Sequence, residues 1–447
     1  MSTCVPEHGD ELLDILRAWP AKFDALLAAA QEHRLQVLFT EVQAVDGQMK
    51  LKRQGFRLDK EYFYPASAIK LCGAVTALEK ARRLSGDLDL GLDIQTPLCF
   101  HPLGPHEKIF DRDPTNREGG FVTLKHEIRK VFLVSDNDAY NRLYTFVGQA
   151  ELNERMWAMG FSACRLTHRL GLSPPDRNKD DPRLGGRVEV RDESAPFCLP
   201  ETRSRLDLGT REGVPGVAVG TGYIEDGRLV EEPMDFSWKN YMTLTDLQDF
   251  LVALFFPAFS RSPTSVLSLP PEQRAVLMEA MLQYPSQSCN PQYDSRHYPD
   301  DYCKFFLPGL CRVSPKADWR IYNKVGRAYG FSIDNAYIMH LPSGRSFFLS
   351  AAIYTNANGI IDDDIYEYDL ADLYLADLGE VLARSALSIP LEQTPLIEPK
   401  EDCIPSSQWP KVLQGNVGSD ELIQHAQEVQ CIILEKQSKT ESPLVTF

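Results

Sequence analysis

Residues 322–354 read YNKVGRAYGFSIDNAYIMHLPSGRSFFLSAAIY and carry the strongest strand signals of the chain. It holds three runs rich in β-branched and aromatic residues, at 322–331, 334–341 and 346–354. Short turns separate these runs, and Pro342-Ser343-Gly344 forms the second turn. Runs of this kind joined by short turns predict neighbouring antiparallel strands. We therefore expect a three-stranded antiparallel meander in the last third of the chain.

Strand signals also occur near the N-terminus. Residues 35–45 (LQVLFTEVQAV) are rich in strand formers, and residues 48–58 are expected to return as their antiparallel neighbour. An amphipathic helix is predicted at 10–33, before these strands, and another at 369–387, after the late strands and with Asp369 as its N-cap. The sequence therefore predicts an α+β fold in which one antiparallel sheet is built from both ends of the chain.

A long segment, mostly helical in pattern, lies between the two groups of strands and is interpreted as an inserted helical domain. Its predicted elements are helices at 67–84, 243–256 and 271–282 and over most residues up to 160, loops at 173–212, and a hairpin at 217–230 that turns at Asp226-Gly227.

These signals divide the chain into four parts. The predicted parts are an N-terminal helix with the first sheet strands (1–66), the inserted helical domain with a loop and hairpin region at 173–235 (67–320), the remaining strands with the C-terminal helix (321–388), and a Pro-rich linker with an amphipathic tail helix at 419–436 (389–447). The tail helix is expected either to dock on its own domain or to bind a partner.

The net charge argues against two classes of protein. The chain has 47 Lys+Arg against 63 Asp+Glu and a net charge of −16, so we expect neither a nucleic-acid binder nor a peripheral protein of anionic membranes. The longest apolar stretch, Phe250–Phe259, has about half of the roughly 20 residues that a membrane-spanning helix needs. Because no secretory leader is visible at Met1–Glu11, the chain is expected to be cytoplasmic if it is complete as given.

The spacing of cysteines and histidines does not indicate a metal or a cofactor. The 10 cysteines include no Cys-x-x-Cys pair, and most of them are interpreted as small buried side chains. His101 and His106 lack a third ligand at suitable spacing, so this segment is interpreted as a loop. We therefore expect no metal and no cofactor.

A candidate nucleophile lies at the start of the inserted domain. The sequence Tyr62-Phe63-Tyr64-Pro65-Ala66-Ser67-Ala68-Ile69-Lys70 contains Ser-x-x-Lys at the beginning of a predicted helix. One helical turn brings the Lys70 amine beside the Ser67 hydroxyl, where a neutral amine can accept the hydroxyl proton. Because this motif arises by chance about once in a chain of this length, its context decides its meaning.

Two further motifs supply that context. Ser135-Asp136-Asn137 lies between two helical stretches, and Lys324-Val325-Gly326 lies in the first late strand. Ser-x-x-Lys, Ser-Asp-Asn and Lys-[Ser/Thr]-Gly in this order are the signature of serine β-lactamases and penicillin-binding proteins. Over about residues 10–388 the chain resembles the class A β-lactamase-like serine hydrolases. The resemblance implies a β-lactamase/transpeptidase-like fold and, if a leader has been removed, a place in the periplasm or cell envelope.

The resemblance also assigns catalytic roles. Ser67 would be the nucleophile that forms an acyl-enzyme, and Lys70 would be the base, kept neutral by burial and by a second lysine. Ser135 would relay a proton to the leaving nitrogen. No metal takes part in this chemistry.

The same resemblance implies a set of substrate-binding residues. Asn137 would hold Lys70 and the substrate amide, and Lys324 would attract an anionic group of the substrate. Gly326 belongs to the same set, and the backbone N–H groups of Ser67 and Arg327 would form the oxyanion hole.

The chain departs from the family pattern at two positions. Val325 stands where the family has Ser or Thr, so the hydroxyl that binds a substrate carboxylate is missing, and Arg327 or Arg345 is the expected substitute. Leu170 and Gly171 stand where the family has its deacylating Glu. The candidate replacements for that base are His168, Asp176 and Asp180.

The sequence therefore predicts a serine hydrolase that cleaves an amide or ester of a small molecule or peptide and is a poor β-lactamase. Three alternatives stay open: a D-alanyl-D-alanine carboxypeptidase or other penicillin-binding protein, a serine-dependent glutaminase, and a non-turnover sensor of β-lactams or peptides.

Overall fold

The computed structural model describes residues 11–45, 48–88, 92–103, 108–172, 180–191, 196–211, 213–262 and 266–390. The predicted Pro-rich linker and the tail helix at 419–436 lie outside the described residues, as do His106 and Asp176. Among the described residues, no helix is both long and apolar enough to span a bilayer.

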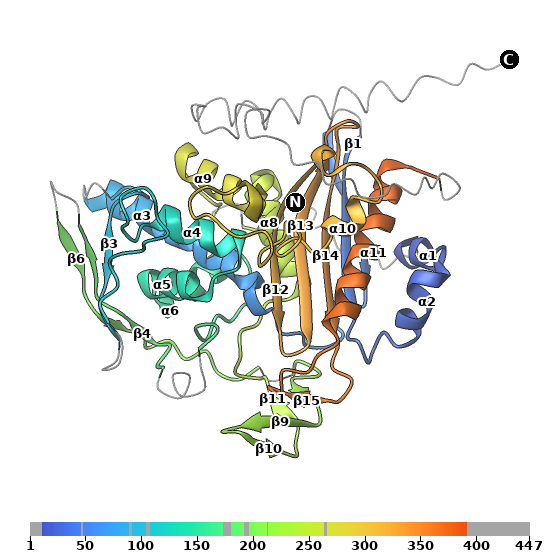
Figure 1. Cartoon of the computed structure of the whole chain (residues 1–447), viewed down its shortest axis with the longest axis horizontal. Coiled ribbons are helices and arrows are strands. Elements are labelled where there is room, and N and C mark those ends of the chain that lie inside the picture. The colour runs from blue at the N-terminus through green and yellow to red at the C-terminus, as the bar shows by residue number, and fades with distance from the viewer. Residues whose placement is uncertain are drawn as a thin grey trace.

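One five-stranded antiparallel sheet organises the molecule (Figure 1). Its strands follow one another in the order β12-β13-β14-β1-β2, so the early hairpin pairs with the late meander through β1 and β14. This confirms the predicted α+β class and the sheet built from both ends of the chain. The strands are β1 (Gln36–Val45), β2 (Gln48–Phe56), β12 (Trp319–Ala328), β13 (Phe331–His340) and β14 (Arg345–Tyr354).

Helices cover both faces of the sheet. On one face, α1 (Glu11–Arg17), α2 (Pro20–Ala28) and α11 (Tyr368–Leu387) enclose a core in which Phe23 and Tyr374 meet. On the other face, α8 (Leu244–Phe255) contacts β1, β13 and β14 and joins the sheet to the inserted helical domain. Figure 1 shows α1, α2 and α11 on one side of the strands and the inserted domain on the other.

The inserted domain is built around α3, whose central turns are buried. The helix α5 packs on α3 so closely that a Cβ on Gly73 would lie 2.7 Å from the Tyr140 ring. The helices of this domain, with the short 3₁₀ turns of the chain, are η1 (Ala66–Ile69), α3 (Lys70–Leu88), α4 (Leu124–Leu133), α5 (Asn137–Val147), α6 (Gln149–Ala158), η2 (Pro257–Phe259), α9 (Pro271–Leu282), η3 (Pro285–Gln287), α10 (Leu307–Leu310) and η4 (Lys316–Asp318).

Two helix predictions were wrong in detail. The predicted helix at 10–33 is two helices, α1 and α2, because Pro20 has no N–H to continue the first helix and instead occupies the first turn of the second. The helix predicted from Asp369 begins at Tyr368 after Glu367, and no side chain caps it. The predicted helices at 243–256 and 271–282 are confirmed as α8 and α9.

The loops predicted at 173–212 are also wrong in part, since short strands occur there. The sequence does not reveal them because β5 acquires its partner from β3, far earlier in the chain. The hairpin that turns at Asp226-Gly227 is confirmed, with φ of 49° and 75° at the two turn residues. The short strands are β3 (Leu98–Phe100), β4 (Leu184–Gly185), β5 (Val188–Val190), β6 (Phe197–Leu199), β7 (Thr202–Arg203), β8 (Ala218–Val219), β9 (Gly222–Glu225), β10 (Arg228–Val230), β11 (Met234–Asp235) and β15 (Ile360–Ile361).

Candidate active site

A pocket of about 500 Å³ opens where the inserted domain meets the edge strand β12. Its lining brings together most of the site residues predicted from sequence. They come from η1, from the α4–α5 connection and from β12, and they are Ser67, Ser135, Asn137 and Arg327, with Val325 beside them.

Ser67 lies in η1, directly before α3. The residue before it, Ala66, has φ of 46°, a left-handed conformation that costs an alanine free energy. The Ser67 side chain is partly exposed and lines the pocket, whereas Lys70, one turn later, is fully buried beneath it. This turn therefore presents a hydroxyl to the pocket above a buried amine.

The Lys70 amine is held by the α4–α5 connection. Its Nζ donates to Asn137 Oδ1 at 2.6 Å and to the Ser135 carbonyl, and it lies 3.4 Å from Ser135 Oγ. Burial, and secondarily the nearby Lys324 cation, hold the pKa of Lys70 well below its usual value. A neutral amine donates two N–H groups to these two acceptors and keeps a lone pair.

The Ser135-Asp136-Asn137 motif is both a helix cap and part of the pocket. Asp136 is the N-cap of α5, and its Oδ1 accepts from the Ala139 N–H at 2.7 Å. Ser135 has φ of 59°, which turns the chain so that its own side chain and that of Asn137 both reach Lys70. The motif therefore caps α5 through Asp136 and contacts Lys70 through Ser135 and Asn137.

Lys324 approaches Ser135 from the opposite side. Its Nζ donates to Ser135 Oγ at 2.9 Å and to the Val325 carbonyl at 2.9 Å. Burial lowers the pKa of Lys324 to about 8. Ser135 Oγ thus lies between two buried amines, one in the helical domain and one in the sheet.

Gly326 allows β12 to lie directly against η1. A Cβ at this position would be 2.4 Å from the Pro65 carbonyl oxygen and 3.1 Å from the Ser67 nitrogen. Such distances exclude any larger residue unless the backbone moves. The glycine therefore brings the backbone of the edge strand beside the Ser67 N–H.

The two arginines expected to replace the missing hydroxyl lie in different places. Arg345 donates to the Ala386 carbonyl at 2.7 Å and to Ser388 Oγ at 2.8 Å, at the opposite end of the sheet from the pocket. The expectation for Arg345 was therefore wrong. Arg327 does line the pocket, but its guanidinium is paired with Asp372 and stacked on Phe305 and Tyr368.

Leu170 and Gly171, which are expected in place of the family's glutamate, are both tightly packed. Gly171 has φ of 66°, and a Cβ on it would lie 2.1 Å from Asn137 Nδ2. The neighbouring Leu170 is fixed by Asn141, which accepts from the Leu170 N–H and donates to its carbonyl, both at 2.8 Å. No side chain fits at Gly171 in this arrangement.

Both described candidates for a replacement base are held by hydrogen bonds. His168 places Nδ1 2.6 Å from the Arg169 carbonyl, and its Nε2 accepts from the Asn240 N–H at 3.4 Å. Asp180 accepts from Arg169 Nη1 at 2.7 Å. Their role as bases stays a prediction, while Asp176 lies outside the described residues.

A buried polar network behind Lys324 was not predicted from sequence. Lys304 Nζ donates to the carbonyls of Met281 and Ile321 and to Asn323 Oδ1, and Asn323 donates to Asp334 Oδ1 at 2.8 Å. Burial lowers the pKa of Lys304 to about 8 and raises that of Asp334 to about 6. The one feature of the sequence that indicates this network is Asp334, a charged residue within the largely apolar strand β13.

Residues 21–192 match the model of the beta-lactamase enzyme family. This region is similar to that family, and it includes Ser67, Lys70, Ser135 and Asn137 but ends before Lys324. No sequence among the curated proteins matches the chain.

Solved structures of β-lactamases are among those similar to the chain. One from Desulfarculus baarsii is 16% identical, covers 81% of this chain and 97% of its own, and superposes with a TM-score of 0.45. One from Xanthomonas campestris is 17% identical, with 84% and 98% covered and a TM-score of 0.44. One from Burkholderia vietnamiensis is 15% identical, with 83% and 98% covered and a TM-score of 0.43.

Proposed function

We propose that the protein is a serine hydrolase that cleaves an amide or ester through an acyl-enzyme on Ser67. The observation that carries the proposal is the Lys70 amine, buried one turn from Ser67, with a depressed pKa and two fixed acceptors for its N–H groups. A lowered pKa favours the neutral amine, whose lone pair can accept the Ser67 proton. The beta-lactamase enzyme family match over 21–192 supports the same chemistry.

In the acylation step, Ser67 Oγ bonds to the substrate carbonyl carbon while its proton passes to Lys70 Nζ. The carbonyl oxygen becomes an oxyanion, and the backbone N–H groups of Ser67 and Arg327 are the proposed donors to it, since Gly326 lets the two segments approach. The tetrahedral intermediate then collapses to the Ser67 ester.

Departure of the leaving group needs a proton. Ser135 Oγ is the proposed donor, because it lies 3.4 Å from Lys70 Nζ and 2.9 Å from Lys324 Nζ. The proton taken from Ser67 thus returns through Lys70 and Ser135 to the leaving nitrogen or oxygen. Net proton transfer is zero, and Lys70 is neutral again.

Hydrolysis of the acyl-enzyme is proposed to be slow. Water must be activated to attack the ester, and Leu170 and Gly171, which we expect in place of the family's glutamate, carry no carboxylate. The described alternatives, His168 and Asp180, are engaged in other hydrogen bonds. We therefore infer a poor β-lactamase.

The lack of the family's glutamate also favours a second candidate function, a sensor that is acylated and does not turn over. A long-lived acyl-enzyme is a liability for a hydrolase but suits a receptor. The two functions differ in the lifetime of the adduct rather than in its formation.

Intact-protein mass spectrometry after addition of benzylpenicillin or a small activated ester tests this proposal. The wild-type chain is expected to gain one adduct and Ser67→Ala none. Ser260→Ala, a remote serine variant, controls for the loss of any serine and is expected to be acylated like the wild type. An adduct that forms equally in Ser67→Ala would contradict the assignment.

A further inference from the structure

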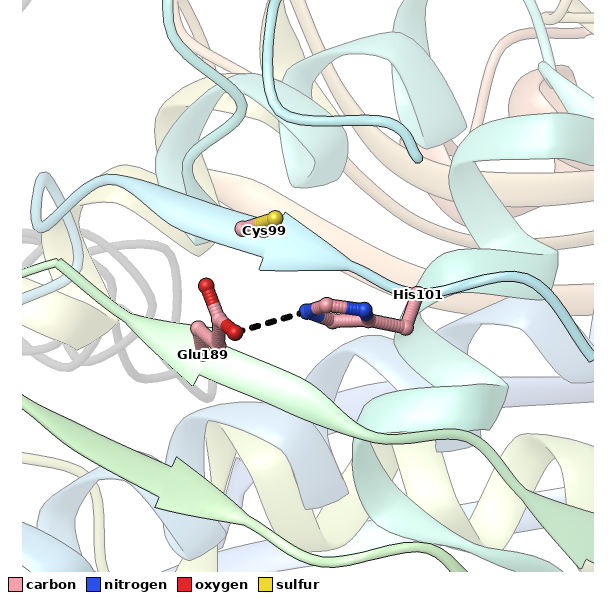
Figure 2. A group of neighbouring side chains, drawn as sticks. All are labelled: Cys99, His101 and Glu189. Atoms are coloured by element: carbon pink, nitrogen blue, oxygen red, sulfur yellow. Dashed lines mark hydrogen bonds and ion pairs between the residues drawn. The ribbon is translucent and has the colours of Figure 1, made fainter. Parts of the chain in front are cut away.

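Three side chains of different chemistry converge on a small sheet away from the pocket. Cys99 lies in β3, His101 directly follows that strand, and Glu189 lies in β5. Their ligand atoms all lie within 4.8 Å of one another, and His101 Nε2 is 2.8 Å from Glu189 Oε1 (Figure 2). We propose that Cys99, His101 and Glu189 form a binding site for a zinc ion.

The register of the strands explains why these side chains meet. Cys99 lies directly opposite Glu189 in the antiparallel pair of β3 and β5, so both side chains point to the same face. His101 is two residues after Cys99, and its N–H donates to the Arg187 carbonyl, which continues the pairing and puts its ring on that face. The opposite face carries Leu98, Phe100, Val188 and Val190 and is part of the apolar core.

The donor set suits Zn²⁺. Thiolate, imidazole and carboxylate are its usual protein ligands, and a mixed set with sulfur disfavours Mg²⁺ and Ca²⁺. Tetrahedral zinc separates its ligand atoms by about 3.3–3.8 Å, given bond lengths of about 2.0–2.3 Å. The three atoms lie within 4.8 Å of one another, and His101 Nε2 and Glu189 Oε1, which are 2.8 Å apart, would part by about 0.5–1 Å to hold the ion. Since the described residues offer no fourth converging ligand, water would complete the coordination.

The surroundings support the ligands without filling the site. Arg187 donates to Glu189 Oε1 at 2.8 Å, and Arg191 lies 3.8 Å from Oε2 while it also pairs with Asp111. Such outer partners orient a metal-bound carboxylate. Cys99 is inaccessible to solvent, whereas His101 and Glu189 are partly exposed, so an ion reaches the thiol from their side.

The site joins β3 to β5, two segments that are far apart in the sequence. The strand β3 lies at the outer edge of the helical domain, whereas β12, which lines the pocket, lies near the centre of the molecule (Figure 1). The ion therefore stabilises this sheet and takes no part in the reaction of Ser67. The inference is independent of the proposed function.

The test uses the full chain, stripped with a chelator and titrated with ZnCl₂ by calorimetry, or with CoCl₂ to observe a thiolate charge-transfer band. One ion per chain is expected, with a higher Tm in its presence. His101→Ala and Cys99→Ser are expected to weaken binding at least about tenfold and Cys99→Ser to abolish the cobalt–thiolate band.

Matched controls separate the site from adventitious binding. Cys289→Ser removes an exposed free thiol, and His297→Ala removes a histidine that is paired with Asp294, and both should bind zinc like the wild type. His101 is partly exposed, so His101→Ala is expected to fold even if Cys99→Ser does not. The inference is overturned if the chain binds no zinc or if His101→Ala binds it unchanged. Acylation of Ser67 by benzylpenicillin should be the same in His101→Ala, whichever result is obtained.

Discussion

Gly171 and Asn137 touch so closely that a Cβ on Gly171 would overlap the Asn137 amide, at 2.1 Å from Nδ2. Asn137 in turn accepts from the Lys70 amine at 2.6 Å. Gly171 is therefore linked through Asn137 to the proposed base, Lys70. Any side chain added at Gly171 is therefore expected to displace Asn137, which holds Lys70.

Gly171→Glu is accordingly expected to slow acylation rather than to restore turnover. The side chain would displace Asn137 and would also strain a backbone with φ of 66°, at a cost of about 1–3 kcal/mol. We expect acylation by benzylpenicillin to fall about tenfold or more, measured by stopped mixing and intact mass.

Gly209→Ala is the control for that experiment. Its φ of 56° gives similar strain, but no atom lies within 4 Å of the added Cβ. It is expected to lower Tm without slowing acylation. Rapid deacylation by Gly171→Glu would show that our description of this contact is wrong.

Lys70→Met is expected to lower the acylation rate at pH 7 by about 10²–10⁴-fold, because general-base catalysis contributes about that much. Methionine is similar in length and suits a fully buried position, so the fold should persist. Circular dichroism and Tm would check the fold, and acylation kinetics the chemistry. Unchanged kinetics in a folded variant would exclude Lys70 as the base.

The pH dependence should differ between anionic and neutral substrates. Burial lowers the pKa of Lys324 to about 8, so Lys324 is a cation below that pH and becomes neutral above it. Acylation by benzylpenicillin, an anion, should therefore decline above about pH 8, whereas acylation by a neutral activated ester should decline less. In Lys324→Met the difference should disappear. A decline that is identical for both substrates would refute this role for Lys324.

The pairing of Arg327 with Asp372 is expected to limit binding of anionic substrates. Both residues line the pocket, and the Asp372 carboxylate neutralises the guanidinium. Asp372→Asn should increase acylation by benzylpenicillin several-fold, with an effect that weakens at high salt. Asp369→Asn, an exposed residue of the same helix, is the control and should have no such effect. Equal gains in both variants would indicate a change in overall charge instead.

Gly326→Ala is expected to reduce acylation by about 10²–10³-fold, the typical loss when an oxyanion-hole donor is misplaced. The added Cβ would lie 2.4 Å from the Pro65 carbonyl oxygen and would push β12 away from η1. Binding of a non-reactive substrate analogue should be affected less than the acylation rate. A variant with wild-type kinetics would exclude this close approach from catalysis.

The main sheet could be predicted because its strands carry their own signals. The β-rich runs predicted at 35–45 and 346–354 are β1 and β14, which pair with each other across the chain. The short strands at 184–203 could not be predicted, because two- or three-residue strands depend on tertiary pairing rather than on local propensity.

The same distinction applies to the sites. Three motifs with fixed local spacing identified Ser67, Ser135 and Lys324, and the structure brings them to one pocket or to its floor. Cys99, His101 and Glu189 were not predicted as a site because their meeting depends on the β3–β5 pairing. The place of Arg345 was missed for a similar reason, since its strand carries it to the end of α11.

We propose that Ser67 is the nucleophile and that its ester persists. The measurement that tests both points follows one benzylpenicillin adduct over hours and maps it by proteolysis. We predict a single adduct on the peptide that contains Ser67, stable over hours in the wild type and absent in Ser67→Ala. An adduct on another residue, or no adduct from either benzylpenicillin or the activated ester, would contradict the account.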